Sequence, residues 1–588
     1  QVLHLLGFTS DRKRMSVIVR TEDGVIKIIC KGADTVMLPR LRTDGPGEKE
    51  CIDATVRHMD TFAREGLRTL VVAQAELDPE AFERWADQFE EASNDLVEIG
   101  KKNRGEPNRI ESIMDLVECN LEVVGSTAIE DKLQAGVANT VSDLMAAGIK
   151  IWVLTGDKEE TAINIAVACQ LLWTEQRMHR TVINLRDTES AELDEIRTVL
   201  EDFLEECIRE RCAFEKETTG ASDPPLPRGL VIDGPALLEA LRTPESQCAL
   251  LRAAQATIDA SDIDLPGTCH CVVGCRMSPD QKRALVSLVR ENVPGTRTLS
   301  IGDGANDVPM IQTAHIGVGI SGQEGMQQAV NASDYAIAQF AFLRKLLLVH
   351  GRWNYRRSSR VVCYLFYKSI MFAGPLIFYA TVNGFSGTLY YEYVTANLYA
   401  VVYTALPILL YGMYDRDISA ETCLRYPQLY AYGIKDGCMR PKIFWSWMFQ
   451  ALLESAFITA MPLVLLTGGR EGMGLVTSTY DYGTVTFALV VVTVSFKMFW
   501  VQYRWTPVHV VVLVFSVFAF FASSLFVNSS ILLNWGYVGV LNPLLRSGSY
   551  WAVTVWCLVL VVGRDWAWKF HHRWWSPRLH HLVMESEK

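Results

Sequence analysis

The 588-residue chain has 67 acidic and 56 basic side chains, a net charge of −11, and 49% hydrophobic against 21% charged residues. This composition excludes an intrinsically disordered chain and a small disulfide-stabilised scaffold, and the acidic balance argues against a nucleic-acid binder. Nearly all long uncharged runs lie after Val361, so we predict a soluble first part and a membrane-embedded second part.

Between residues 120 and 320, short apolar segments alternate with helical patterns. Strands are predicted in LEVVGSTAI, GIKIWVL, GLVIDG, CVVGC and TLSIG, and helices follow most of them. This alternation is typical of a doubly wound parallel sheet. Residues 174–267 interrupt it with charged and then proline-rich sequence, which we interpret as an exposed insertion with some helix around 191–212.

Polar loops follow several of these strands, at positions that a parallel sheet brings to one edge. They contain Thr155–Gly156–Asp157, the turn before Lys282, and the glycine-rich GDGAND, where Asp303 and Asp307 are four residues apart. Such a loop alone is more often a turn, but with a nearby threonine and lysine it predicts a Mg²⁺ site for phosphoryl transfer. The pattern G-x-x-x-x-G-K-[ST] does not occur, so the chain is not a P-loop enzyme.

Three cysteines and a histidine cluster in CHCVVGC, namely Cys269, His270, Cys271 and Cys275. Alternate residues of a strand point to opposite faces, and no second cluster completes four ligands. We therefore favour buried structural thiols, with a zinc site as the alternative.

Six apolar runs approach or reach the roughly 20 residues that cross a bilayer. They cover about 361–382, 393–413, 443–466, 484–503, 508–527 and 549–563. Basic residues gather before the first run, between the second and third, and after the last, whereas the loops on the other side carry few. This asymmetry predicts a cytosolic soluble part and a cytosolic carboxyl-terminal tail.

Three ionisable side chains lie inside these runs: Lys368, Glu454 and Lys497. Charged groups at membrane depth are costly and are functional candidates. Glu454 and Lys497 either pair with each other or reach the interface, whereas we assign Lys368 to function.

Pro407 either unwinds a turn beside a transport path or only kinks its helix. The first two runs contain no Asp or Glu, which disfavours a hard cation and favours a neutral, zwitterionic or anionic cargo.

A series of motifs resembles one family over almost the whole chain. SDRKRMSVIVR, KGAD, GLRTL, IEDKLQ, VLTGDK, GCRMSPDQK and IGDGANDVPMI, followed by six apolar runs, resemble P-type ATPases. FYK, YTALP, YDRDIS and RDWAWK resemble the type IV branch, the phospholipid flippases. The resemblance implies a haloacid-dehalogenase-like doubly wound parallel sheet, a partial α+β nucleotide-binding domain and a six-helix transmembrane bundle.

The resemblance also implies a nucleotide pocket. Phe8 would stack on adenine, and the residues around the nucleotide would be Ser10, Lys31, Gly32, Arg68 and Arg276. The basic run Arg12–Lys13–Arg14 beside Phe8 fits an ATP cradle, and the alternative is a strand core with solvated charges.

At the phosphoryl site, the resemblance places catalytic and nucleotide-contacting roles on Thr155, Gly156, Asp157, Lys282 and Asn306. Asp303 and Asp307 would bind Mg²⁺, Asp307 would also contact the nucleotide, and Asp131 lies in the matching acidic loop. The substrate path would include Lys368, Ser369, Ala400 and Pro407.

The chain departs from the family pattern in three respects. It has no DKTGT motif, and the phosphorylated aspartate, the actuator domain and the first four spans would precede Gln1. With no initiator Met or signal peptide, the chain is interpreted as a fragment or an incomplete gene model. Ser369 and Ala400 stand where the family usually has Asn, which affects the expected headgroup preference.

We therefore predict an ATP- and Mg²⁺-dependent phospholipid flippase, inactive as this chain alone. The expected domains are part of the nucleotide-binding domain (1–117), the phosphorylation domain (118–344), the membrane domain (345–570) and a cytosolic tail (571–588). The rivals are a truncated, non-catalytic ATP-binding membrane protein and a cation pump. The resemblance implies a two-span glycosylated accessory beta subunit. The organelle is left open, with the plasma membrane, the Golgi and endosomes as the alternatives.

Overall fold

The computed structural model describes residues 1–8, 12–43, 45, 47–64, 67–103, 107–129, 133–173, 178–183, 193–216, 228–254, 269–321, 327–465 and 478–587. The chain forms two compact units. The first unit comprises Gln1–Met145 and Lys150–Phe342, and the second comprises Ala146–Ile149 and Leu343–Lys588.

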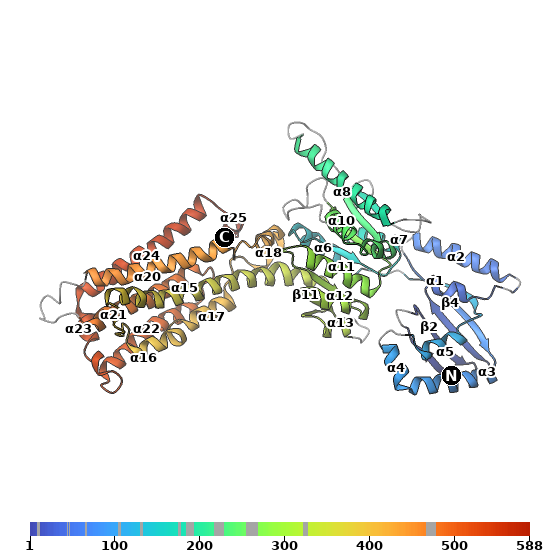
Figure 1. The fold of residues 1–588 in the computed structure, drawn as a ribbon, viewed down its shortest axis with the longest axis horizontal. Coiled ribbons are helices and arrows are strands. Elements are labelled where there is room, and N and C mark those ends of the chain that lie inside the picture. The colour runs from blue at the N-terminus through green and yellow to red at the C-terminus, as the bar shows by residue number, and fades with distance from the viewer. Residues whose placement is uncertain are drawn as a thin grey trace. The chain divides into compact units, whose positions relative to one another are not determined.

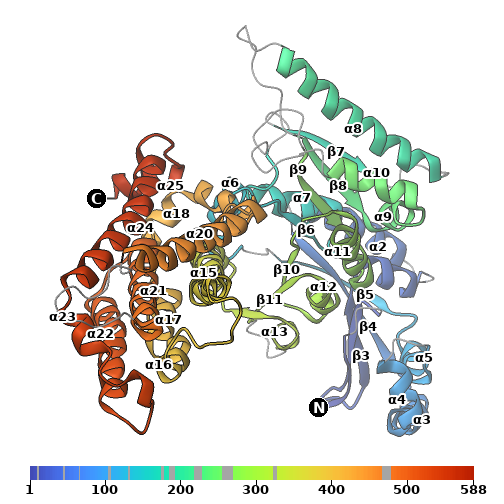
Figure 2. The same ribbon diagram turned by 60° about the vertical axis from the view of Figure 1, so that its left-hand side comes forward.

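The first unit begins with a five-stranded antiparallel sheet in the order β1-β2-β3-β4-β5. Its strands are β1 (Val2–Leu6), β2 (Arg14–Arg20), β3 (Ile26–Gly32), β4 (Arg68–Leu77) and β5 (Glu122–Ile129). The helices of this region are α1 (Asp34–Met37), α2 (Glu48–Arg64), α3 (Pro79–Asn94), α4 (Leu96–Asn103) and α5 (Arg109–Val117). Ile18, Ile28, Val71 and Trp85 belong to their shared core, and Figure 2 shows α3, α4 and α5 grouped beside the sheet.

One predicted strand forms but pairs elsewhere. We expected LEVVGSTAI to join the parallel sheet, whereas β5 pairs with β4 in antiparallel fashion, with Arg68 opposite Ile129 and Gln74 opposite Glu122. A strand's apolar pattern specifies its burial and leaves its partner open, so the pattern alone could not make this choice.

The remaining strands of the first unit are all parallel, as predicted, but they form two sheets. One has the order β6-β9-β8-β7 and the other β10-β11-β12. The strands are β6 (Trp152–Leu154), β7 (His179–Ile183), β8 (Arg228–Asp233), β9 (Cys269–Cys275), β10 (Leu299–Gly302), β11 (Ile316–Ile320) and β12 (Tyr335–Ile337). All six residues of β8 are buried, as expected for a parallel strand covered on both faces.

Helices connect these parallel strands. They are α6 (Val137–Ala146), α7 (Glu159–Ala168), α8 (Leu193–Lys216), α9 (Gly234–Ala240), α10 (Pro244–Ala254), α11 (Pro279–Asn292), α12 (Val308–Thr313) and α13 (Gln328–Asn331). The helix expected around 191–212 is α8, and most of the rest of the proposed insertion lies outside the described residues. The domain boundaries at residues 117, 344 and 570 remain predictions.

Within its described residues, the second unit has six helical segments long and apolar enough to cross a membrane. They are Phe342–Val382, Tyr393–Tyr414, Pro441–Leu465, Thr479–Val501, Pro507–Ser529 and Gly548–Trp574. Figure 1 shows their principal helices α15 (Arg352–Val382), α17 (Ala405–Tyr414), α20 (Pro441–Leu465), α21 (Thr479–Val501), α22 (Pro507–Ser529) and α24 (Gly548–Trp574) side by side. The apolar window of α21 is 78% buried, against 22–39% in the others, so α21 is the central helix of the bundle.

The first, second and last spans differ from a simple helix of the predicted length, and the first begins at Phe342 rather than near Val361. The second is α16 (Tyr393–Leu398), a π-helical segment (Tyr399–Tyr403) and α17, and Thr404 between the last two has φ −123° and ψ −11°. This interruption lies three residues before Pro407, whose ring removes a backbone hydrogen bond. The last span was expected to end at Gly563, but α24 continues to Trp574.

The smaller helices of the second unit are α14 (Phe342–Lys345), α18 (Ala420–Arg425), α19 (Ala431–Ile434), α23 (Leu541–Arg546) and α25 (Leu579–Ser586). A π-helical segment, Leu346–Gly351, leads from α14 into α15.

Candidate functional sites

The Thr155–Asp157 loop follows β6 and is held by the turn that follows β9. The Thr155 hydroxyl donates to Asp157 Oδ2 at 2.9 Å and accepts from the Asp157 backbone N–H at 3.1 Å. The backbone N–H groups of Arg276 and Met277 donate to the carbonyls of Asp157 (2.8 Å) and Thr155 (3.0 Å). Two predicted loops are therefore adjacent at the carboxyl ends of neighbouring parallel strands.

A second contact joins Lys282 to the loop after β10. Lys282 lies in the first turns of α11, which Ser278 and Gln281 cap reciprocally. Its Nζ is 2.9 Å from Asp307 Oδ1, and both side chains are largely buried. Gly302 is required here, because a Cβ on it would lie 2.4 Å from the Asp307 Cβ.

The two acidic residues of this loop, Asp303 and Asp307, differ in whether their carboxylates are free to bind Mg²⁺. Asp307 is paired with Lys282, whereas Asp303 is exposed. The described residues contain no group of three or more His, Cys, Asp or Glu side chains that could enclose a metal ion. An exposed carboxylate in a glycine-rich loop nevertheless fits Mg²⁺, which commonly takes one or two carboxylates together with phosphate oxygens and water.

The proposed nucleotide residues that the structure describes lie in or beside the antiparallel sheet, except Arg276, which follows β9 of a parallel sheet. Phe8 follows β1 and is 61% exposed, and Lys31 is exposed on β3. A Cβ on Gly32 would lie 2.6 Å from the Arg14 Cβ, so glycine permits the close approach of β2 and β3. Ser10, Asp131 and the Arg68 side chain lie outside the described residues.

The two arginines of the basic run at residues 12–14 are not available to bind ATP. Arg12 Nη2 is 2.5 Å and Arg14 Nε 2.6 Å from the two carboxylate oxygens of Glu118, which is fully buried. Arg14 also pairs with Asp115, and the Ser16 hydroxyl donates to Glu118 at 2.6 Å. Neither expectation for Arg12 and Arg14 holds, since both are buried and bound to a carboxylate about a hundred residues away.

One ion pair connects the KGAD turn with the TGDK turn. Lys158 Nζ lies 2.7 Å from Asp34 Oδ2, and both side chains are partly exposed. Burial raises the pKa of the Asp34 carboxyl, but the hydrogen-bonded Lys158 ammonium outweighs it, and the net shift is downward. This pair fixes the first helix after β3 against the loop that carries Thr155.

In the second unit, Lys368 faces the interruption of the second span. Its ammonium donates to Thr404 Oγ1 at 2.9 Å, and the Thr404 hydroxyl donates to the Tyr399 carbonyl at 2.8 Å. The Tyr399 hydroxyl donates to the Lys368 carbonyl at 2.8 Å. Lys368 is 8% exposed and forms no ion pair with any residue that the structure describes.

Three further residues assigned to the substrate path differ in burial. Pro407 is buried, whereas Ser369 and Ala400 are exposed on their helices. The Ser369 hydroxyl donates to the Leu365 carbonyl of its own helix. The hydroxyl contact to Lys368 comes from Thr404, which the sequence did not single out.

The direct pairing of Glu454 with Lys497 is wrong. Lys497 Nζ is 2.5 Å from Asp565 Oδ2 on α24. Glu454 accepts from the Tyr367 hydroxyl at 2.5 Å and from Gln450 Nε2 at 2.8 Å, and Arg564 is 3.4 Å away. Asp565 was missed because it lies beyond the predicted end of the last apolar run.

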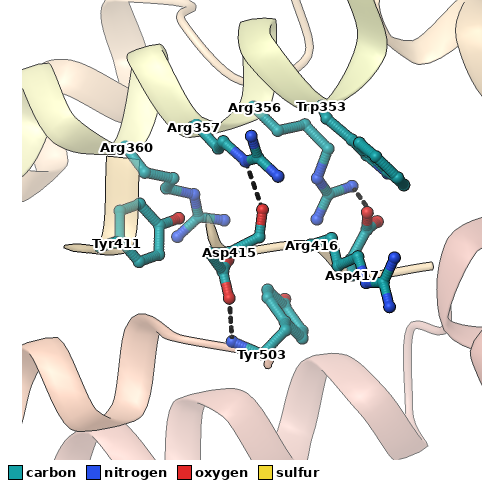
Figure 3. Close-up of a pocket in the computed structure, with 9 residues that line it drawn as sticks. All are labelled: Trp353, Arg356, Arg357, Arg360, Tyr411, Asp415, Arg416, Asp417 and Tyr503. Atoms are coloured by element: carbon teal, nitrogen blue, oxygen red, sulfur yellow. Dashed lines mark hydrogen bonds and ion pairs between the residues drawn. The ribbon is translucent and has the colours of Figure 1, made fainter. Parts of the chain in front are cut away.

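An arginine-rich pocket lies where α15 meets the YDRDIS loop (Figure 3). Asp417 pairs with Arg352 at 2.7 Å and Arg356 at 3.0 Å, while the Asp415 carboxylate accepts from two backbone N–H groups, those of Tyr503 and Arg504. Burial raises the pKa of Asp417, but the two arginines outweigh it and hold the pKa at about 2. The cavity of about 10 Å³ holds about one water, so we interpret this cluster as an ionic junction.

The cysteines of β9 behave as buried thiols where they are described. Cys271 and Cys275 are buried, and burial raises the pKa of Cys275 to about 12. A buried, uncharged thiol of this kind fits the interpretation of these cysteines as structural. The side chains of Cys269 and His270 lie outside the described residues.

Comparisons with known proteins match both units. Residues 330–578 match the family described as phospholipid-translocating P-type ATPase C-terminal, and residues 2–136 match P-type ATPase, cytoplasmic domain N. A phospholipid-transporting ATPase of Schizosaccharomyces pombe is 36% identical over 595 residues, covering 100% of this chain and 44% of that protein. A phospholipid-transporting ATPase of Saccharomyces cerevisiae is 36% identical (100% of this chain, 41% of that protein), and a probable one of Arabidopsis thaliana is 37% identical (100% and 45%).

The chain thus spans less than half the length of these curated relatives. The two family matches cover the antiparallel sheet at one end of the chain and all six apolar spans at the other. The chain belongs to the phospholipid-transporting (type IV) branch of the P-type ATPases.

Proposed function

We propose that this chain is the part of an ATP-driven phospholipid translocase that binds ATP, completes the phosphoryl site and carries part of the lipid path. The phosphorylated aspartate would lie outside the chain, and lipid would move toward the cytosolic leaflet. The observation that carries the proposal is the buried Lys368 ammonium, which faces the interrupted second span. Among the residues that the structure describes, a threonine hydroxyl is its only side-chain partner.

The lipid class follows from the electrostatics at Lys368. A buried ammonium without a carboxylate needs an anionic or strongly dipolar partner. A lipid phosphate supplies one, whereas a hard cation would be repelled. The same observation therefore disfavours the cation-pump alternative.

The phosphoryl chemistry rests on residues at the carboxyl ends of the parallel strands. The Thr155 hydroxyl and the Lys282 ammonium are suited to bind phosphoryl oxygens, and Asp307 holds Lys282 in place. Mg²⁺, when bound at Asp303, would neutralise charge that develops on the transferred group. Gly156, Asp157 and Asn306 would complete the loops around this group.

The nucleotide would be held by Phe8, Ser10, Lys31, Gly32, Arg68 and Arg276. The exposure of Phe8 and Lys31 supports this, because an aromatic face and an ammonium in solvent are available to a nucleotide. The cytosolic orientation is supported by the distribution of basic residues around the spans. An accessory two-span subunit is proposed from the family resemblance alone.

Lys368→Ala tests the lipid site. In the complete protein, we expect the lipid concentration required for half-maximal dephosphorylation to rise about tenfold, equivalent to about 1.4 kcal/mol. Phosphorylation by ATP without lipid should survive, because the phosphoryl site is built from residues of the other unit. The measurement is phosphoenzyme formation followed by its lipid-stimulated decay.

Two further variants sharpen this experiment. Thr404→Val should give a smaller shift in the same direction, and Lys345→Ala, which removes an exposed lysine of α14, should give none. Normal lipid dependence in Lys368→Ala would make Lys368 structural. Loss of phosphorylation in every variant would favour the non-catalytic alternative. Decay of the phosphoenzyme that responds to a metal cation would favour the cation pump.

Reversal of the Asp34–Lys158 pair tests the closure of the nucleotide site. Asp34→Lys or Lys158→Asp alone should weaken binding of trinitrophenyl-ATP about threefold, because each places like charges at 2.7 Å between the two turns. The double reversal should restore the affinity.

The matched control is the Lys27–Glu76 pair, which joins β3 to β4 at 2.9 Å. Lys27→Glu should leave the affinity unchanged in a fluorescence titration. If the double reversal binds no better than the single variants, the pair does not position the nucleotide.

A further inference from the structure

Asp233, at the end of β8, is a buried acid outside the predicted site residues. It is 1% exposed, and its Oδ1 accepts from the Gly234 backbone N–H at 2.8 Å, which caps α9. Its Oδ2 is buried and has no hydrogen-bond partner among the described residues. A buried carboxylate with an unused oxygen requires a nearby cation.

That cation is Arg276, in the turn after the neighbouring strand β9. Arg276 Nη1 lies 3.5 Å from Asp233 Oδ2, which is within ion-pair distance although no hydrogen bond forms. The backbone of Arg276 is left-handed, with φ 52°, a costly conformation for a residue with a side chain. The hydrogen bond from its backbone N–H to the Asp157 carbonyl holds this conformation.

The turn that carries Arg276 also packs directly on the residue after Asp233. A Cβ on Gly234 would lie 2.5 Å from the Arg276 carbonyl oxygen, so only glycine permits this approach. Gln281 Nε2 donates to the Gly234 carbonyl at 3.0 Å. The Asp233–Gly234 turn therefore supports both the side chain and the backbone of this loop.

The Arg276 guanidinium keeps most of its hydrogen-bonding capacity. A guanidinium has five N–H donors, and within the described part of the chain this one forms an ion pair but no hydrogen bond. Its side chain is 20% exposed. Asp233 thus neutralises and orients one edge of the guanidinium, and the side chains that the structure describes leave the other donors open to an anionic ligand.

We propose that Asp233 is a positioning residue that orients Arg276 toward the nucleotide. The inference rests on the proposed function, because it takes Arg276 to be a nucleotide contact. Asp233 itself does not contact the nucleotide; it fixes the position of the Arg276 guanidinium.

A double-mutant cycle tests this in the full chain with trinitrophenyl-ATP and Mg²⁺. Arg276→Gln and Asp233→Asn should each weaken binding about tenfold, since asparagine retains the helix cap and loses the charge. The double variant should bind no more weakly than Arg276→Gln alone. Asp233→Ser, which also keeps a capping oxygen, should show the same loss of affinity as Asp233→Asn. It replaces Asp233→Asn in the cycle if that variant does not fold.

Asp78→Asn is the matched control, because Asp78 caps α3 through its side chain at an exposed position. It should leave both the affinity and the thermal midpoint near those of the parent. Normal affinity in Asp233→Asn, or additive losses in the double variant, would overturn the positioning role while leaving the nucleotide site intact. Normal affinity in Arg276→Gln would instead remove the nucleotide role of Arg276 and the inference with it.

Discussion

Replacing Glu118 by glutamine is expected to lower the local stability of the antiparallel sheet by about 3 kcal/mol, the lower end of the range for breaking a buried ion pair. Glu118 is fully buried and accepts from Arg12, Arg14 and Ser16. Glutamine keeps the shape but leaves two buried guanidinium groups without their shared carboxylate. Hydrogen exchange in the full chain should show at least a hundredfold loss of protection in β2 and β3.

The control is Glu122→Gln, on the exposed face of β5, which should change protection little. Burial raises the pKa of Glu118, but Arg12 and Ser16 outweigh it and the net shift is downward. The stabilisation is therefore present at neutral pH and is lost only as the pH falls below the ordinary carboxyl range. Protection within threefold of the parent would show that the network contributes little.

Asp303→Asn in the complete protein is expected to lower the rate of phosphorylation by ATP at least about a hundredfold, roughly 2.7 kcal/mol of barrier. Asp303 is the exposed acid of the loop after β10, whereas Asp307 is engaged by Lys282. Asparagine keeps the shape of the loop and removes one charge that would hold Mg²⁺. Phosphoenzyme formation measured across a Mg²⁺ titration should show both the slower rate and a higher Mg²⁺ requirement.

Asp280→Asn provides the comparison, because Asp280 is an exposed acid in the first turn of the nearby α11. It should phosphorylate at the parental rate. Activity of Asp303→Asn within a few-fold of the parent, at the same Mg²⁺ concentration, would mean that Asp303 does not bind the metal ion.

The local order of elements could be predicted from the sequence because it depends on short-range patterns. Uninterrupted apolar runs such as that of β8 identify strands. Runs of about 20 apolar residues identify six spans, which agree in number with those found in the described residues. Loops at the ends of parallel strands bring Asp157 and Arg276 together because parallel strands end at one edge of a sheet.

The pairing of strands and of charges was decided by the tertiary structure. The two-residue alternation of a strand indicates which of its faces is buried. It does not determine whether β5 pairs with β4 or with a parallel strand. Arg12 and Glu118 are 106 residues apart, and Lys497 and Asp565 are 68 apart, so no local spacing relates them. Buried charges take whichever opposite charge the packing brings within reach, and that choice depends on helix and strand positions that no local sequence pattern encodes.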